Sequence, residues 1–237
     1  MTQALDLPGS IRTSLDGLVD ALKTALGADL SAVLVFGSAA RGRYRPGESD
    51  VDVCVVLKDT SADNLKKAAN PLVLARNTAR IEAVVLRDDE IGRAADAFPV
   101  FYDDIKRAHV MLHGDDPFAS LSIAKEHKRV RVEQELREAQ IRLRRAVVDG
   151  LFAERPLRGA VTRKLRQLRS PLHALFELLD EPSPDEIEPL LALASKRWGL
   201  SLGALEDGHA KAEDAHAALV ALLDRSIDEV DRLGGAA

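Results

Sequence analysis

Two aspartates separated by one valine are the residues of this sequence best placed for chemistry. Asp50, Val51 and Asp52 begin a run that is otherwise rich in valine. Alternate side chains of a strand point to opposite faces, so the two acids share one face while Val51 points into a core. Carboxylate oxygens are the ligands that hard divalent cations prefer. An Asp-x-Asp pair alone is a weak signal, but it predicts a cation-binding strand start.

A glycine and a serine end the preceding apolar run, and they strengthen this prediction. Gly37 allows the backbone to turn sharply, and Ser38 can open a helix whose free N–H groups and hydroxyl face an anion. Arg41 and Arg43 follow within five residues of Ser38, and guanidinium groups neutralise phosphates well. Phosphate and metal would then meet at one place. The expected nucleotide-binding residues are Gly37, Ser38, Arg41 and Arg43.

A third carboxylate lies farther along the chain. Glu82 is the only acid inside the apolar run 81–86. A buried carboxylate without a partner is energetically costly, and a metal ion is a natural partner for it. The alternative is that Glu82 lies on the exposed side of an ordinary strand. The neighbouring acids 88–90 compete for the same role, although a helix N-terminus there would favour acids for dipole reasons alone.

Elements that can position these residues follow from periodicity and turn signals. Apolar residues recur at helical spacing from Ser10 to about Ala25. Beta-branched runs predict the strands that carry the motif residues, and the stretch 61–80 between two of them reads as a helix broken near Pro71. A short helix is expected from Asp88. The expected strands are Ser31–Phe36, Val51–Leu57, Ile81–Leu86 and an edge strand His109–Leu112.

The pattern changes to long helical periodicity after the turn at residues 113–117. Four helices in a bundle are expected there. We therefore predict an α+β protein, with a small mixed-sheet catalytic domain over residues 1–117 and an all-α helical-bundle domain over residues 118–237. The expected helices of the second domain are Ile123–Val148, Arg158–Leu179, Asp185–Trp198 and Glu213–Leu233.

Composition limits the functional classes. Cys54 is the only cysteine and no N-terminal segment resembles a signal peptide, so we expect a reducing, cytoplasmic setting. No apolar run is long enough to span a bilayer. The net charge of −5 and the 4% aromatic content argue against a nucleic-acid binder. Residues 119–169 are nevertheless basic, with 14 Lys or Arg against 6 Asp or Glu. They can pair with the acidic helices that follow, hold phosphate in a cleft, or form a nucleic-acid-binding face.

The spacing of the motif resembles that of a known superfamily. Eleven residues separate Ser38 from Asp50, after an apolar strand that ends in Gly37-Ser38. The order of these features is a strand, then Gly-Ser, then a gap, then Asp-Val-Asp. Over about residues 30–90 this order resembles that of the DNA polymerase beta-like nucleotidyltransferases. The resemblance implies two Mg²⁺ ions on Asp50 and Asp52, with Glu82 on the ion that binds the acceptor hydroxyl. It also implies attack on the α-phosphorus of a nucleoside triphosphate and release of pyrophosphate.

The helical second half resembles, more loosely, that of aminoglycoside-type nucleotidyltransferases, in which the acceptor lies between the two domains. This likeness implies transfer of a nucleoside monophosphate, most often AMP from ATP, to a hydroxyl of an unidentified small molecule or protein. The alternative is an antitoxin-like module that modifies or binds a partner protein. The ribonuclease motif of such partners has Arg and His five positions apart, whereas Arg169 and His173 are four apart here.

A second metal site is a weaker hypothesis. His209, Glu213 and His216 are spaced by four and three, so they would share one face of a helix. The stretch is rich in alanine and polar residues, and a solvated helix end explains the pattern as well.

Overall fold

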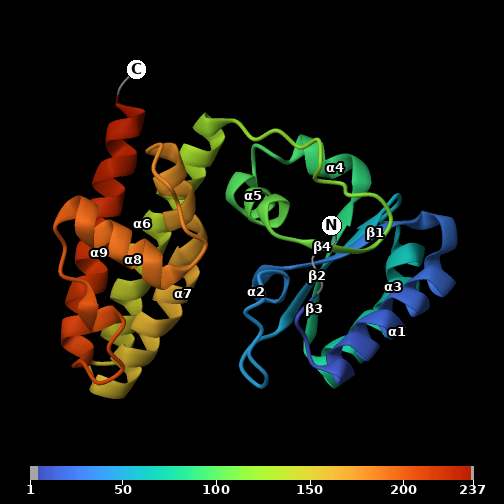
Figure 1. Cartoon of the computed structure of the whole chain (residues 1–237), viewed down its shortest axis with the longest axis horizontal. Helices are drawn as coiled ribbons and strands as arrows, with labels where there is room; N and C mark the ends of the chain where they lie inside the picture. The colour runs from blue at the N-terminus through green and yellow to red at the C-terminus, as the bar shows by residue number, and fades with distance from the viewer. Residues whose placement is uncertain (1–4, 236–237) are drawn as a thin grey trace. The chain divides into compact units, whose positions relative to one another are not determined.

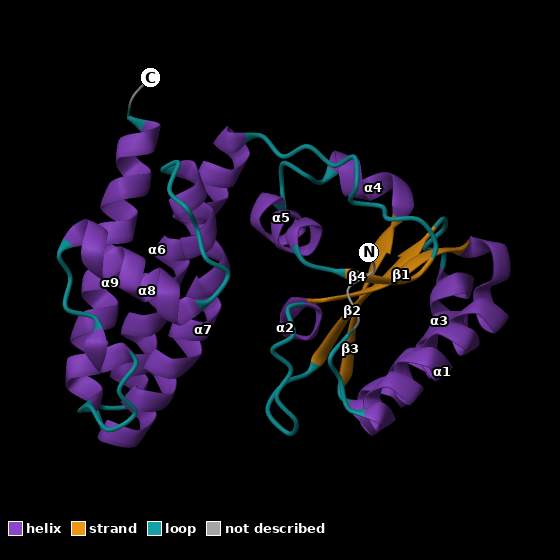
Figure 2. Ribbon diagram, in the orientation of Figure 1, coloured by secondary structure: helices purple, strands orange, loops and turns teal. Residues whose placement is uncertain are grey.

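The computed structural model describes residues 5–235, and the chain divides into two compact units between Ile123 and Ala124 (Figure 1). The first unit contains all the strands found in the described residues, together with several helices. The second is helical (Figure 2). The expectation of an α+β fold followed by a helical region is confirmed.

The first unit alternates strands and helices along the chain. Its strands are β1 (Leu30–Phe36), β2 (Val51–Leu57), β3 (Ile81–Arg87) and β4 (Val110–His113), all within a residue or so of the predicted ranges. Its helices are α1 (Gly9–Leu26), α2 (Gly37–Ala40), α3 (Ala62–Ala79), α4 (Asp88–Arg93) and α5 (Pro99–Arg107), with a 3-10 turn η1 (Gly27–Asp29).

The four strands form one mixed sheet in the order β3-β2-β1-β4. β1 is antiparallel to β2 and to β4, while β2 and β3 are parallel. Parallel neighbours need a crossover connection, and α3 supplies it. Both parallel strands therefore start at the same edge of the sheet, with Val51 opposite Ile81 and Asp52 opposite Glu82.

Each face of the sheet is buried by different helices. Alternate valines of β1 and β2, such as Val33 and Val53, pack with α1 and α3, which Figure 1 shows side by side. The opposite face, with Leu34 and Cys54, packs against α4, α5 and the segment around Phe118. Period two places Asp52 and Glu82 on this second face, at the edge where β2 and β3 begin.

Two elements differ from the sequence expectation. The expected break near Pro71 is absent, because α3 runs through Pro71 as one helix from Ala62 to Ala79. A proline removes one helical hydrogen bond, and the packing of Ala68 and Ala75 into the core offsets that loss. Helix α5 was not predicted, although Pro99 occupies a first helical position that favours a helix start.

The second unit is built from α6 (Lys125–Asp149), α7 (Glu154–Leu178), α8 (Ile187–Trp198), η2 (Gly203–Leu205) and α9 (Ala212–Gly234). The helices α6, α7 and α9 pack against one another, and α8 packs on α7 (Figure 2). No helix in the described part of the chain has both the length and the apolar character needed to cross a membrane.

Candidate functional site

The two acids predicted on separate strands lie side by side in the sheet. Asp52 is directly opposite Glu82 on β3, and on its other side it is opposite Phe36 at the end of β1. Asp52 is therefore on a central strand, between two hydrogen-bonded neighbours. Residues of adjacent strands in register have side chains about 5 Å apart at their Cβ atoms, so the two carboxyl groups share one small region.

The chain turns at Gly37, directly beside the Asp52 carboxyl group. Its φ angle is +69°, in the left-handed region where glycine is favoured. A Cβ atom at this position would lie 2.2 Å from Asp52 Oδ2, far inside van der Waals contact. Glycine is thus required twice, for its backbone conformation and for its missing side chain. The turn brings the half-buried Ser38 and the short helix α2 close to the Asp52 carboxyl group.

Charge accumulates around Asp52. The pKa of its carboxyl group is raised to about 6, mainly by burial and in addition by the nearby carboxylates of Asp50 and Glu82. The positive charge of Arg41 opposes them, and Asp104 adds to them. Asp52 is therefore electrostatically coupled to several neighbouring charged side chains.

Asp50 and Glu82 are held by two arginines at the C-terminal end of α3, Arg76 in its last turn and Arg80 at its C-cap. Arg80 Nε donates a hydrogen bond of 2.8 Å to Asp50 Oδ1, and Arg76 Nε donates one of 2.9 Å to Glu82 Oε1. Within residues 5–235, no three His, Cys, Asp or Glu side chains are grouped closely enough to hold a metal ion. The three acids are neighbours, but a ready-made ligand cage is absent from the described structure.

Arg41 lies deeper than its proposed role at the phosphates suggests. Its side chain is only 5% exposed, and its Nη2 atom is 2.9 Å from the Asp104 carboxylate and 3.1 Å from the Asp104 carbonyl oxygen. Arg107 contacts the same carboxylate at 2.6 Å. Arg41 is thus a fixed positive charge beside Asp52, anchored to α5.

Asp104 was missed because α5 was missed. The signal available in the sequence was the helix start at Pro99 followed by apolar residues at positions 102 and 105 and acids at 103 and 104. Nothing in that segment indicates which arginine its acids contact, since Arg41 is far away along the chain.

Arg43 lies in the loop that joins α2 to β2. It is half-buried, and its backbone N–H donates a 2.9 Å hydrogen bond to Ser38 O. The tip of the loop is exposed, with Arg45 near Glu48 at 3.8 Å. Arg80 Nη1 donates a hydrogen bond of 2.8 Å to the Gly47 carbonyl oxygen, so the C-terminal end of α3 also holds the loop.

Comparison with known proteins identifies the family of this chain. A nucleotidyltransferase domain family matches residues 15–135, a little over half of the chain. The chain belongs to this nucleotidyltransferase family. The match covers every motif residue predicted from sequence and extends into α6. No curated protein matches the sequence.

Solved structures resemble this nucleotidyltransferase distantly. A spectinomycin adenyltransferase from Enterococcus faecialis, solved with ATP and spectinomycin, shares 13% identity over 91% of this chain and 98% of its own, with a TM-score of 0.49. A toxin-antitoxin structure with AMP-PNP shares 18% identity over 58% and 98%, with a TM-score of 0.31. A putative nucleotidyltransferase from Sulfolobus solfataricus shares 22% identity over 38% and 85%, with a TM-score of 0.27.

The competing acids of this nucleotidyltransferase lie elsewhere. Asp88, Asp89 and Glu90 form the first turn of α4, directly after β3. Glu82 is near the start of that seven-residue strand, so the competitors are at its opposite end. Asp89 pairs with Arg93 at 2.7 Å. These acids belong to a helix N-terminus, as the alternative interpretation proposed.

Two histidines of the second unit have contacts to nearby residues of that unit. His216 packs edge-on against Phe152, with ring centroids 5.4 Å apart. His173 is buried, with its Nδ1 atom 3.0 Å from the Pro184 carbonyl oxygen and 2.9 Å from Ser183 Oγ, and its Nε2 atom lies 3.3 Å from Glu177. Its proximity and that of Lys128 lower the pKa of Glu177 to about 2.

Much of the basic stretch pairs with acids of its own unit. Arg137 bridges Glu133 and Asp231, and so ties α6 to α9. Lys128 reaches Glu177 of α7 at 2.9 Å. These contacts agree with the interpretation that the stretch 119–169 balances the acidic helices after it.

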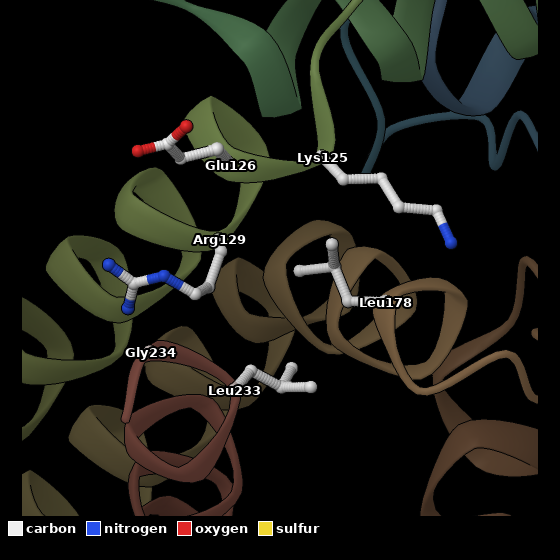
Figure 3. A pocket seen from close by; sticks show the side chains of 6 residues that line it. All are labelled: Lys125, Glu126, Arg129, Leu178, Leu233 and Gly234. Carbon is white, nitrogen blue, oxygen red and sulfur yellow. The ribbon is translucent and has the colours of Figure 1, made fainter. Parts of the chain in front are cut away.

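A pocket of about 430 Å³ lies in the second unit, where α6 begins and α7 and α9 end (Figure 3). None of the acids predicted from sequence lines it. Its two basic groups already have partners, since Lys125 contacts Asp180 at 3.1 Å and Arg129 contacts Glu133 at 3.0 Å. The lining residues are Lys125, Glu126, Arg129, Leu178, Leu233 and Gly234.

Proposed function

We propose that this nucleotidyltransferase moves a nucleoside monophosphate, AMP from ATP in the first instance, to a hydroxyl group and releases pyrophosphate. The observation that carries the proposal is the close approach of three features. Asp52 and Glu82 are in register at the start of two parallel strands, and the Gly37 turn contacts the Asp52 carboxylate. The chemistry belongs to the domain that we place at residues 1–117.

The donor set suits magnesium. All three candidate ligands, Asp50, Asp52 and Glu82, offer carboxylate oxygens, and a hard divalent cation would relieve the repulsion that raises the pKa of Asp52. Asp50 and Glu82 are exposed enough to turn away from their arginines. Bound there, two Mg²⁺ ions would stabilise charge on the attacking and the leaving oxygens.

Each residue has a role in this scheme. Asp50 and Asp52 would hold the cations, and Glu82 would take the proton of the acceptor hydroxyl. The acceptor oxygen forms a bond to the α-phosphorus while the bond from that phosphorus to the bridging oxygen breaks, and pyrophosphate carries away the electron pair. Gly37 and Ser38 bind the phosphates through backbone N–H and hydroxyl groups.

The arginines of the loop complete the phosphate site. We place Arg43 near the nucleotide phosphates and assign Arg41 a fixed positive potential from its buried position beside Asp52. The acceptor is a hydroxyl of a small molecule or of a partner protein. Both acceptor classes use the same three acids, so the first experiment addresses the nucleotide.

The test is calorimetric titration of ATP into the full chain with and without Mg²⁺. Binding is expected only with Mg²⁺ and is expected to disappear in Asp52→Asn. Asp89→Asn is the matched control, because it makes the same substitution at an exposed acid of α4 and should bind like the wild type. Equal binding by the wild type and Asp52→Asn would refute the proposed site.

Transfer itself is measured with ATP labelled at the α-phosphate and a panel of hydroxyl-bearing compounds that includes spectinomycin. A labelled product with one pyrophosphate released per transfer supports the reaction. Release of label as AMP alone, at a rate that Glu82→Gln does not change, would contradict the role given to Glu82.

A further inference from the structure

Arg80 occupies a backbone position that ordinarily selects glycine. It ends α3 with φ +52° and ψ +40°, the left-handed conformation in which helices commonly stop at a glycine. A side chain other than glycine, asparagine or aspartate is uncommon there. Arg80 thus occupies a disfavoured backbone conformation, and its side chain makes contacts that a glycine could not make.

The side chain of Arg80 joins two parts of the candidate site. Its Nε atom bonds to Asp50, and its Nη1 atom bonds to the Gly47 carbonyl in the motif loop. One turn earlier on the same helix, Arg76 bonds to Glu82. Two of the three carboxylates thus have an arginine of α3 where a cation would otherwise bind.

We propose that Arg76 and Arg80 are built-in counter-cations that occupy Glu82 and Asp50 until a divalent cation displaces them. The inference rests on the proposed function, since it takes these acids as cation ligands. Side-chain exposure makes the exchange feasible: Arg76 is 65% exposed and Arg80 52% exposed, so both guanidinium groups can move into solvent. Arg76 and Arg80 bond to the other two carboxylates, so Asp52 is the ligand that a cation would contact first.

The two arginines should affect the order in which the cation and the nucleotide bind. A free cation must break two ion pairs, whereas a cation that arrives with a triphosphate brings negative charge that can accept the displaced guanidinium groups. Cation and nucleotide should therefore bind with positive coupling, and part of that coupling should depend on the two arginines.

The experiment measures Mn²⁺ binding to the full chain without nucleotide, from the electron spin resonance signal of free Mn²⁺ at about 0.15 M salt, where distant charges are screened. Arg80→Gln and Arg76→Gln should each tighten Mn²⁺ binding about two- to fivefold, the range expected for removing one competing exposed ion pair. Addition of α,β-methylene-ATP, which cannot be cleaved at the transferred phosphate, should strengthen Mn²⁺ binding less in these variants than in the wild type.

Arg93→Gln is the matched control. It makes the same change of charge at an arginine that is 67% exposed and pairs with Asp89, an acid outside the site. An equal tightening in Arg93→Gln would show a general charge effect and overturn the proposal. Unchanged or weaker binding in both Arg80→Gln and Arg76→Gln would overturn it as well.

Two further variants separate the causes of failure. Arg80→Gly should fold, because glycine suits the left-handed position, and it should tighten Mn²⁺ binding as Arg80→Gln does. Asp52→Asn should abolish binding. If Asp52→Asn binds Mn²⁺ like the wild type, the proposed function itself fails. If it loses binding while the arginine variants match the wild type, only the counter-cation role fails.

Discussion

At the scale of single residues, the site is defined by how closely the backbone of Gly37 approaches Asp52. A strand start with two acids is common, but a glycine whose missing Cβ leaves room for a carboxylate oxygen is a specific arrangement. It couples the turn that we propose binds phosphate to the carboxylate that we propose binds a cation, so a change at either residue should affect the other.

Gly37→Ala should therefore impair both stability and function. The new Cβ would overlap Asp52 Oδ2 and would also occupy a left-handed backbone position, for a combined loss of about 2–4 kcal/mol in the free energy of unfolding. Gly47→Ala is the control, because Gly47 has φ +81° but open space around it. Urea unfolding and Mg²⁺-dependent ATP titration are the measurements. Equal effects of the two variants would contradict the steric argument.

The raised pKa of Asp52 predicts a trade of stability for function. Its folded-state pKa of about 6 lies above the ordinary 3.8, so the folded protein binds the extra proton between these values. The ionised carboxylate therefore destabilises the fold fully above pH 6, and this effect disappears as the pH falls below about 4.

Asp52→Asn should thus stabilise the metal-free protein at pH 8, by about 1–2 kcal/mol once solvent screening reduces the full linkage value. The gain should shrink at pH 5 and vanish near pH 4. Urea unfolding in EDTA at each pH measures it. Asp89→Asn is expected to behave oppositely, because ion pairing with Arg87 lowers the pKa of Asp89. A gain that does not vary with pH would contradict this account.

At the scale of elements, α5 and α3 fix the motif from two sides. α5 contributes Asp104, which anchors Arg41 under the loop, and α3 contributes the arginines that hold the acids. Both helices follow strands of the same sheet, so the sheet determines where their charged side chains can reach.

Breaking the Arg41–Asp104 pair should be costly, since these side chains are only 5% and 13% exposed. Asp104→Asn removes the carboxylate that contacts the buried Arg41 guanidinium and should lower stability toward the lower end of roughly 3–5 kcal/mol. The exposed pair of Asp63 and Lys66 is the control, and Asp63→Asn should lose under about 1 kcal/mol. In an Arg41→Gln background the loss from Asp104→Asn should fall to the cost of breaking the remaining Arg107–Asp104 pair. Additive losses would show that the two residues act independently.

At the scale of the whole molecule, charge is arranged by sequence segment. The basic stretch 119–169 largely overlaps α6 and the first half of α7, and several of its arginines pair with acids of α6 and α9. The net charge of −5 therefore hides internal compensation within the helical unit. The family match runs from residue 15 to 135, so it covers all four strands of the sheet and the first turns of α6.

The sequence alone determined the parts of this protein that depend on local rules. Strand periodicity placed Asp52 and Glu82 on the strands that carry them, the Gly-Ser turn followed from its position after an apolar run, and the helical second half followed from spacing of three and four. These features are decided by residues within a few positions of one another, which is why they are readable without a structure.

Only the tertiary structure decided the partners of these residues. Three of these contacts join positions 15 to 30 residues apart. They are the register of β2 with β3, the close approach of Gly37 to Asp52, and the pairing of Asp50 with Arg80. The Arg41–Asp104 pair joins positions 63 residues apart. Such contacts depend on how the α3 crossover returns the chain to the sheet and on where α5 packs, because a charged side chain can pair with any opposite charge that the fold brings within reach.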